Sequence, residues 1–169
     1  MSDRQIDIRA ATENDFPAII ALNRAQVEHT SAMDLARLRL LHGYASYHRV
    51  VLVDGQFAGF LLGMREGAAY DNDNYRWFAD RFERFAYVDR IVVADGFWGL
   101  GLGKRLYRDL ITQARAWGSA RITCEYNVEP PNLASAAFHD SFGFRELDQQ
   151  HLLGGSKRVS LQVLDLASA

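Results

Sequence analysis

The sequence predicts one α/β domain built on a mixed β-sheet. The chain has 169 residues, which is close to the size of a single domain. Its apolar residues follow a strand-like period of two in some stretches and a helical period in others. Residues 85–93 have strong β character and lead through a glycine-rich turn into a helical pattern and then another strand. That order is typical of a parallel crossover.

The N-terminal third predicts one strand and two helices. Residues 5–10 alternate apolar and polar side chains, as a half-buried strand does. Thr12 and Asp15 have the spacing of a capping box, which opens a helix. The apolar residues of that helix recur at helical spacing: Phe16, Ile19, Ile20 and Val27. A second helix is expected over residues 33–44, with one apolar stripe: Leu35, Leu38 and Leu41.

The middle of the chain predicts a hairpin and a short helix. Residues 49–54 and 57–65 are rich in β-formers, and the two residues between them, Gly55 and Gln56, suit a tight turn. Residues 67–85 interrupt the strand pattern. Aromatic side chains recur there at helical spacing, which predicts a short helix capped by Asn72 or Asp73.

The C-terminal half predicts a helix, a strand, a short helix and two further strands. The long helix follows the glycines and ends before Gly118, with one apolar face: Leu102, Leu106, Leu110, Ala114 and Trp117. The remaining elements are expected at residues 121–128, 132–141, 144–152 and 157–166, with a last turn at Gly154 and Gly155. We therefore expect a sheet that is antiparallel at its start and parallel in its middle, within a single domain of residues 1–169.

Composition and charge exclude several classes of protein. The chain is 49% hydrophobic and 24% charged, as globular proteins are. A net charge of −2 and a pI near 6.2 give no electrostatic reason to expect a nucleic-acid partner. The N-terminus lacks a signal-peptide pattern, and no apolar run approaches the length of about 20 residues that spans a membrane. We therefore expect a cytoplasmic protein with no membrane partner.

Cysteine and histidine usage predicts no metal. Cys124 is the only cysteine, so neither an internal disulfide nor a cysteine-based zinc cluster can form. It alternates with Ile122 and Tyr126, which favours burial as a small apolar residue over a nucleophilic role. The remaining candidates show no metal-ligand spacing: His29, His42, His48 and His151.

The glycine-rich turn at residues 99–103 predicts an anion site. A strand that enters a helix through alternating glycines exposes backbone N–H groups beside the positive end of the helix dipole. Lys104 and Arg105 follow in the first helical turn, where a bound polyphosphate would attract them. The P-loop pattern fails at Trp98 and Arg105, and the dinucleotide pattern fails at Lys104. A plain strand-to-helix turn is the alternative.

Three stretches resemble, in order, the GCN5-related N-acetyltransferase (GNAT) superfamily. Residues 98–103 are similar to its acetyl-CoA signature of Arg or Gln, two residues, Gly, one residue, and Gly or Ala. Trp98 stands where the signature has Arg or Gln. Residues 8–17 are similar to the family's first strand and helix start. Residues 132–144 match its pattern of Asn, an apolar helix and a terminal Gly-Phe.

The resemblance implies a GNAT-like fold and an acetyl-CoA site. The fold would have a mixed central sheet, flanked by helices, whose parallel strand pair splays apart to admit the pantetheine arm. The residues implied in binding acetyl-CoA are Ile91, Val93, Trp98, Gly99, Leu100, Gly101, Leu102, Gly103, Lys104, Asn132 and Phe138.

The resemblance also implies catalytic groups. The amide of Val93 would polarise the thioester carbonyl. His139 stands where many relatives have a tyrosine that protonates the leaving thiolate, and a packing role is its alternative. Asp89 would accept a proton from the attacking amine, with an ion pair to Arg90 as the alternative reading. Glu125 is a second candidate base.

The acidic and aromatic segment at residues 70–85 is a candidate for the acceptor pocket, where relatives often shape theirs. Asp71 and Asp73 would attract a cationic amine, and nearby aromatic rings would form a wall: Tyr70, Tyr75 and Trp77. A solvated helix cap is the alternative.

The expected activity is acetyl-CoA-dependent N-acetylation of a small-molecule or peptide amine by direct attack in a ternary complex. Transfer of a longer acyl group is one alternative. A non-catalytic CoA-binding or interaction module is another, because Trp98 and His139 depart from the family pattern. A homodimer is compatible with the sequence.

Overall fold

Changes in apolar periodicity mark the elements of the computed structural model, which describes residues 3–26, 30–152 and 157–166. The strands of this part are β1 (Ile6–Ala10), β2 (Tyr47–Val53), β3 (Gln56–Arg65), β4 (Ala86–Val93), β5 (Arg121–Glu129), β6 (Arg145–His151) and β7 (Arg158–Asp165). The helices are α1 (Phe16–Ala25), α2 (Leu35–Tyr44), α3 (Asp73–Ala79), α4 (Leu102–Ala116) and α5 (Leu133–Phe142), with short 3-10 turns at Glu13–Asp15 and Asp95–Phe97.

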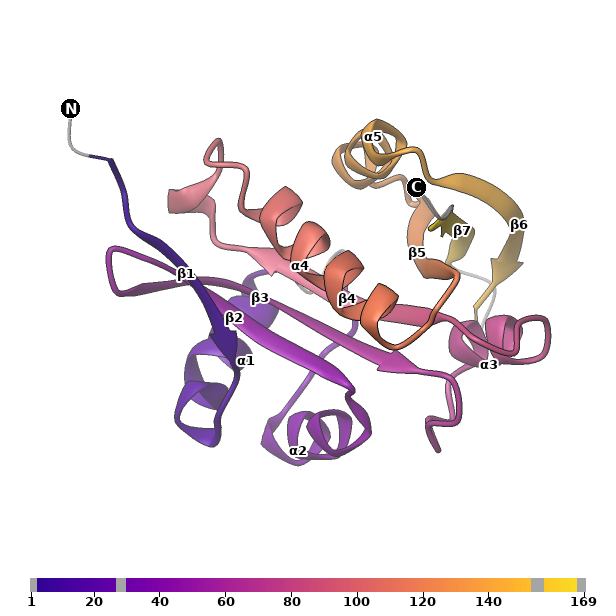
Figure 1. Cartoon of the computed structure of the whole chain (residues 1–169), viewed down its shortest axis with the longest axis horizontal. Helices are drawn as coiled ribbons and strands as arrows, with labels where there is room; N and C mark the ends of the chain where they lie inside the picture. Colours follow the sequence, from indigo (N-terminus) through magenta and orange to yellow (C-terminus); the bar gives the residue numbers. More distant parts are fainter. Residues whose placement is uncertain (1–2, 27–29, 153–156, 167–169) are drawn as a thin grey trace. The chain divides into compact units, whose positions relative to one another are not determined.

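The expected mixed sheet is confirmed. The strand order is β1-β2-β3-β4-β5-β7-β6 (Figure 1). Strands β1, β2 and β3 pair antiparallel, β4 and β5 pair parallel, and β7 is antiparallel to both β5 and β6. The parallel pairing joins Ala86 to Ile122 and Tyr87 to Thr123.

The described residues belong to two compact units. The first comprises residues 1–64 and 89–112, and the second comprises residues 65–88 and 113–169. Strand β4 contributes its first residues to the second unit and its last residues to the first. A single domain over residues 1–169 stays a prediction.

In the first unit, α1 and α2 lie on one face of the antiparallel strands and α4 lies on the other (Figure 1). Alternation along β2 explains this, because successive side chains of a strand point to opposite faces. Tyr47 and Arg49 hydrogen-bond to Asp109 of α4. His48, between them, packs against Phe16 of α1.

The helix caps follow the predicted pattern. The Thr12 backbone N–H donates to the Asp15 carboxylate at 2.8 Å, as a capping box requires. The Asn72 side chain caps α3 by accepting from the Tyr75 backbone N–H at 3.0 Å. Both caps precede segments that bury their apolar side chains.

Two local expectations are wrong. The β2–β3 hairpin turns at Asp54 and Gly55, whose φ angles of 50° and 81° suit a tight hairpin turn, while Gln56 already belongs to β3 and pairs with Val53. Leu35 is 42% exposed, because the buried stripe of α2 begins one turn later at Leu38. The expectations for Val27, Gly154 and Gly155 fall outside the described residues.

In the second unit, aromatic side chains form much of the core. The rings packed against one another are Tyr70, Tyr75, Phe78, Phe85 and Tyr87, and all are buried. Cys124 is also buried, as expected of a small apolar residue. Tyr87 brings the start of β4 into this core.

Candidate active site

The glycine turn of the first unit connects the end of β4 to the start of α4. Gly99 and Gly101 have φ angles of 87° and 71°, a region that L side chains rarely adopt. A Cβ at either residue would meet no atom within 4 Å, so the turn faces open space. The Arg105 N–H donates to the Gly101 carbonyl at 3.1 Å and closes the first helical turn. The N–H groups before it have no intrahelical acceptor.

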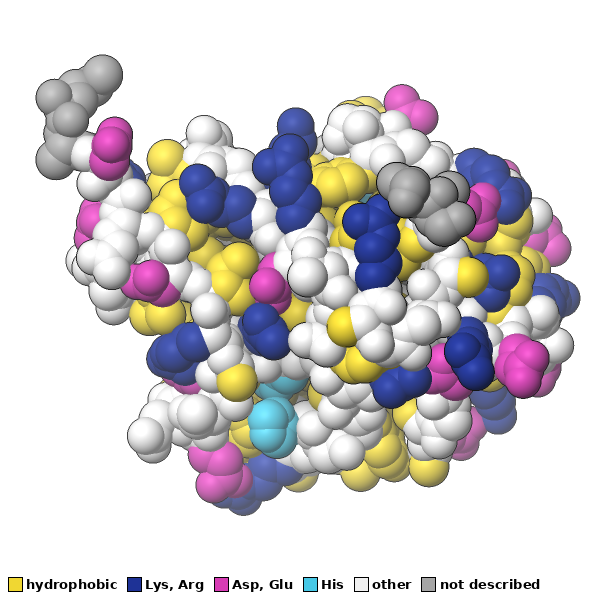
Figure 2. All heavy atoms as spheres, in the orientation of Figure 1, with side chains coloured by type: hydrophobic (Ala, Val, Ile, Leu, Met, Phe, Trp, Pro, Cys, Tyr) yellow, Lys and Arg dark blue, Asp and Glu magenta, His cyan; other side chains and the backbone are white. Residues whose placement is uncertain are grey.

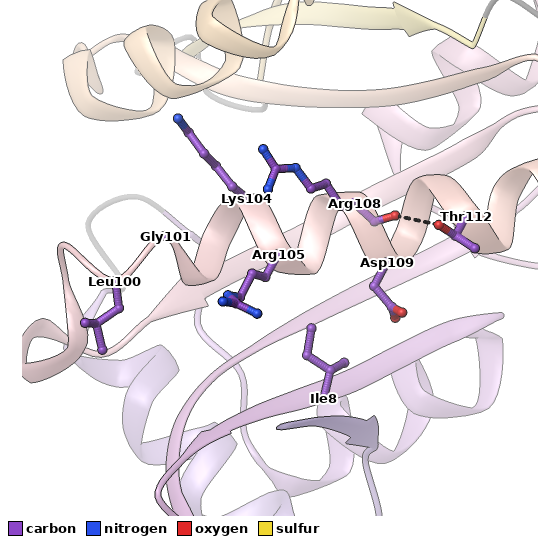
Figure 3. A pocket seen from close by; sticks show the side chains of 8 residues that line it. All are labelled: Ile8, Leu100, Gly101, Lys104, Arg105, Arg108, Asp109 and Thr112. Carbon is purple, nitrogen blue, oxygen red and sulfur yellow. Dashed lines mark hydrogen bonds between the residues drawn. The ribbon is translucent and has the colours of Figure 1, made fainter. Parts of the chain in front are cut away.

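A pocket of about 580 Å³ opens beside this turn. Figure 3 shows its lining: Ile8, Leu100, Gly101, Lys104, Arg105, Arg108, Asp109 and Thr112. Most of these residues come from the first three turns of α4. The predicted phosphate-binding turn therefore continues into a pocket along the same helix.

The pocket is strongly cationic. Lys104, Arg105 and Arg108 form no ion pair within the described part of the chain. The single carboxylate of the lining, Asp109, accepts from Arg49 at 2.8 Å and from the Tyr47 hydroxyl at 2.7 Å. Arg49 already compensates this carboxylate. The positive charges of Lys104, Arg105 and Arg108 can therefore attract an anion.

Trp98 takes a position that the sequence did not predict. Its indole N–H donates to the carbonyl of Val93 at 3.0 Å, and the residue is 64% exposed. The Val93 carbonyl is therefore occupied by the protein itself.

The end of β4 lies unusually close to β3. A Cβ added to Gly59 would stand 2.6 Å from the Val92 carbonyl oxygen and 3.2 Å from the Val93 Cα. The Ala94 N–H donates to the Ala58 carbonyl at 2.8 Å on the same stretch. Gly59 thus permits the position of the Val93 backbone.

Asp89 and Arg90 form a buried ion pair in the first unit. Arg90 Nε donates to the Asp89 carboxylate at 2.7 Å, and both side chains are 4% exposed. The Arg90 guanidinium also donates to Asn23 at 3.0 Å, to Thr30 at 3.1 Å and to both oxygens of Ser31 at 2.9 Å. This is the ion-pair alternative that the sequence left open.

Glu125 meets Tyr87 in the second unit. The Tyr87 hydroxyl lies 2.8 Å from each oxygen of the Glu125 carboxylate. Tyr87 is fully buried on β4, whereas Glu125 on β5 is half-buried. Tyr87 pairs with Thr123 in the parallel register, and Glu125 stands two residues after Thr123 on β5.

His139 is buried in α5 at 3% exposure. Its Nδ1 lies 2.7 Å from the Ser135 carbonyl oxygen, which can only accept, so Nδ1 carries a proton. Burial lowers the pKa of His139 from its ordinary value, and the hydrogen bond to Ser135 opposes this. The ring packs against Tyr126, Phe138 and Phe144.

Asn132 precedes the helix that carries Phe138 and His139. The Asn132 side chain caps α5 by accepting from the Ser135 N–H at 3.2 Å, and its own N–H donates to the Asn127 carbonyl. The Phe138 ring contacts those of His139 and Phe142. The structure thus brings Asn132, Phe138 and His139 together within the second unit.

The predicted residues of the first unit also lie along one continuous stretch. Asp89, Ile91 and Val93 belong to the last part of β4. Residues 98–104 follow as the turn and the start of α4. Lys104 and the expected Arg105 line the pocket together with Arg108, which was not predicted there. Its spacing of four residues from Lys104 along one helix was the available signal.

The acidic segment before α3 is an ion-paired helix start. Arg76 contacts the carboxylates of both Asp71 and Asp73, at 2.7 Å and 2.5 Å. Tyr70 and Tyr75 are buried in the core. Arg81 stacks on Trp77 at 3.7 Å from the ring centroid. These contacts match the solvated-cap alternative.

Two further observations concern metals and membranes. Across residues 3–26, 30–152 and 157–166, no group of three or more His, Cys, Asp and Glu side chains is arranged to hold a metal ion. In the same part of the chain, no helix combines the length and apolar character needed to cross a membrane.

Comparisons with known proteins agree with this architecture. The model of the acetyltransferase (GNAT) family matches residues 11–144. Ard1 from Thermoplasma volcanium superimposes with a TM-score of 0.77 at 15% identity, covering 96% of this chain and 99% of that one. The ribosomal-protein-S18-alanine N-acetyltransferase from Escherichia coli gives 0.73 at 18% identity, with 98% and 96% covered.

A third similar structure contains acetyl-CoA. It is yncA from Salmonella typhimurium, with a TM-score of 0.69 and 21% identity over 98% of this chain and 96% of that one. No curated protein sequence matches the chain.

Proposed function

Because the chain belongs to the GNAT acetyltransferase family, we propose that it transfers the acetyl group of acetyl-CoA to a primary amine of a small molecule or a peptide. The observation that carries the proposal is the cationic pocket that continues from the glycine turn at the end of β4. Its backbone N–H groups and unpaired cations suit the phosphates of CoA.

The residues of the turn fit a phosphate-bearing substrate. Gly99 and Gly101 leave open space where side chains would otherwise stand. The free N–H groups at the start of α4 would bind the pyrophosphate, and the cations of the first helical turns would add positive charge beside it. By the resemblance to the family, Asn132 and Phe138 would contact the pantetheine arm. The exposed Trp98 ring replaces the family's polar side chain and leaves this binding to the backbone.

Acetyl-CoA supplies an acetyl group on a thioester, whose carbon the amine attacks. The new bond joins the amine nitrogen to the carbonyl carbon, and the carbon–sulfur bond breaks. We assign the Val93 N–H as donor to the carbonyl oxygen, where charge develops. Its position depends on Gly59, as described above.

We assign the proton acceptor to Glu125 in preference to Asp89. Protonating Asp89 would break its buried pair with Arg90 and leave a buried guanidinium uncompensated. Glu125 is half-buried and accepts from the Tyr87 hydroxyl at 2.8 Å. Protonating it leaves the buried pair of Asp89 and Arg90 intact.

His139 is the proposed proton donor to the thiolate. Since Nδ1 already donates to Ser135, the donated proton must come from Nε2 of a doubly protonated ring. That form is populated below the lowered pKa of His139. The proton then passes to sulfur and leaves a neutral imidazole. Water is the alternative donor.

The similar structures favour an α-amine as acceptor. One of them acetylates an alanine of a ribosomal protein. Another, Naa50 of Arabidopsis thaliana, is in complex with a bisubstrate analogue that joins CoA to a peptide. We therefore place peptides with a free N-terminal amine first among acceptors and small-molecule amines second.

Calorimetry with acetyl-CoA and CoA is the first test, and absence of binding to the folded protein would refute the proposal. Release of CoA with a panel of peptide and small-molecule amines is the second. Binding without release for any amine would support the non-catalytic module instead. Comparing acetyl-CoA with longer acyl-CoA substrates would separate acetyl transfer from the alternative acyl transfer.

A further inference from the structure

Lys104 and Arg108 are two neighbouring cations on α4. They are four residues apart, about one helical turn, and Figure 3 shows both side chains extending to the same side of the helix. Neither forms an ion pair within the described residues. Like charges at this spacing destabilise a helix by a few tenths of a kcal/mol. An anion bound between them would convert that repulsion into attraction.

Arg105 differs from this pair, although it lines the same pocket. Its side chain extends to the opposite side of α4, the side on which Ile8 and Asp109 lie (Figure 3). Asp109 is already held by Arg49 and Tyr47. Arg105 therefore adds general positive charge to the pocket, whereas Lys104 and Arg108 form the more specific two-point contact.

A phosphate monoester is the anion that suits the Lys104 and Arg108 pair. It carries nearly two negative charges at neutral pH and presents several oxygens that a guanidinium can bind in a bidentate manner. CoA contains one such group, the 3′-phosphate of its ribose, in addition to the pyrophosphate. With the pyrophosphate at the glycine turn, a site one helical turn further along α4 is available for this second group.

We propose that Arg108, together with Lys104, binds the 3′-phosphate of CoA and makes the protein select CoA over dephospho-CoA. This inference rests on the proposed function. It assigns a recognition role to a residue outside the glycine turn. The arginine fork supplies the specificity, and the neighbouring lysine adds charge.

The test is calorimetric titration with CoA and with dephospho-CoA, which lacks only the 3′-phosphate. Because hydrogen bonds to charged groups are strong, the folded wild-type protein should bind CoA at least about tenfold more tightly than dephospho-CoA. Arg108→Gln should lower the affinity for CoA to the level of that for dephospho-CoA. It should leave the affinity for dephospho-CoA nearly unchanged. Arg108→Lys should retain part of the preference, since it keeps the charge but loses the fork.

Arg105→Gln is the matched control, because it removes the same charge from the other side of the same helix. It should change the affinities for both ligands by the same factor. Equal affinities in the wild type would overturn the inference, as would a loss of preference in Arg105→Gln as large as in Arg108→Gln. If the wild type binds neither ligand, the proposed function itself fails. Circular dichroism checks that each variant is folded.

Discussion

Asp109 of α4 and Arg49 of β2 form an ion pair of 2.8 Å, and the same carboxylate oxygen accepts from the Tyr47 hydroxyl at 2.7 Å. The partners are 60 and 62 residues apart in sequence. Burial, followed by the bond to Asp109, raises the pKa of Tyr47 above its ordinary value. The contact joins α4 to the antiparallel strands and compensates the carboxylate that lines the pocket.

Asp109→Asn is expected to lower the free energy of unfolding by about 1 to 2 kcal/mol, because it removes a charge that two partners hydrogen-bond. Urea denaturation would measure the loss. Asp165→Asn is the control, since Asp165 pairs with Arg145 while more than half exposed. It should change stability by less than about 0.5 kcal/mol. Equal losses in the two variants would contradict the role of the Asp109 contact.

Gly101→Val should weaken CoA binding by about tenfold, because valine is strained at a φ of 71° by roughly 1 to 3 kcal/mol. Its Cβ meets no atom within 4 Å, so the effect comes from the backbone. Calorimetry with CoA measures it. Gly96→Val is the control, since Gly96 also faces open space but has no positive φ. Unchanged affinity in folded Gly101→Val would remove the turn from the proposed site.

Gly59→Ala is expected to reduce turnover and to cost about 1 to 3 kcal/mol of stability, because the new Cβ must displace the Val92 carbonyl. The shift reaches the adjacent Val93 amide, so kcat should fall more than CoA affinity. Gly43→Ala, in the open on α2, should instead stabilise the protein slightly. A normal kcat in Gly59→Ala would argue against the Val93 amide as the polarising group.

Acid should destabilise the protein through His48. Burial, and then the proximity of His42, lowers the pKa of His48 to about 4, while Asp15 opposes the shift. Between about pH 6.5 and 4, His48 is therefore protonated in the unfolded chain and neutral in the folded chain. Stability from this group is complete above pH 6.5 and declines as pH falls, by up to about 1.4 kcal/mol per pH unit.

His48→Gln should flatten this decline, as urea denaturation at several pH values would reveal. The glutamine can still hydrogen-bond to His42, whose Nδ1 lies 2.8 Å from that of His48. The buried His139 contributes a decline of the same sign, so some slope will persist. His151→Gln, at an exposed position on β6, should leave the profile unchanged. An equal slope in His48→Gln and the wild type would exclude His48 as the cause.

His139→Tyr should extend the activity to higher pH. A phenol keeps its proton up to about pH 10, whereas the imidazolium loses its proton as the pH rises through the lowered pKa of His139. His139→Ala should lower kcat by about 10² to 10⁴ if the ring is the acid. The pH profile of kcat at saturating acetyl-CoA measures both. An alanine variant with normal kcat and a lower melting temperature would identify His139 as a packing residue.

Local sequence patterns predicted much of the fold because they involve residues close together in the chain. The helical spacing of α4, the Thr12 and Asp15 cap and the Asn72 cap depend on neighbours within a few positions. The hairpin turn was misplaced by one residue, because Gly55 fits either position and only the register with β1 and β3 decides it.

The sequence by itself also determined the family, since the glycine turn and the Asn132 helix carry its motifs in order. Only the tertiary structure decided which charges are available. Asp89 is paired with Arg90, and Asp109 is paired with Arg49, while Lys104 and Arg108 form no ion pair among the residues that the structure describes. The strength of a charge depends on its partners and its burial, and strand packing brings these partners from distant parts of the chain.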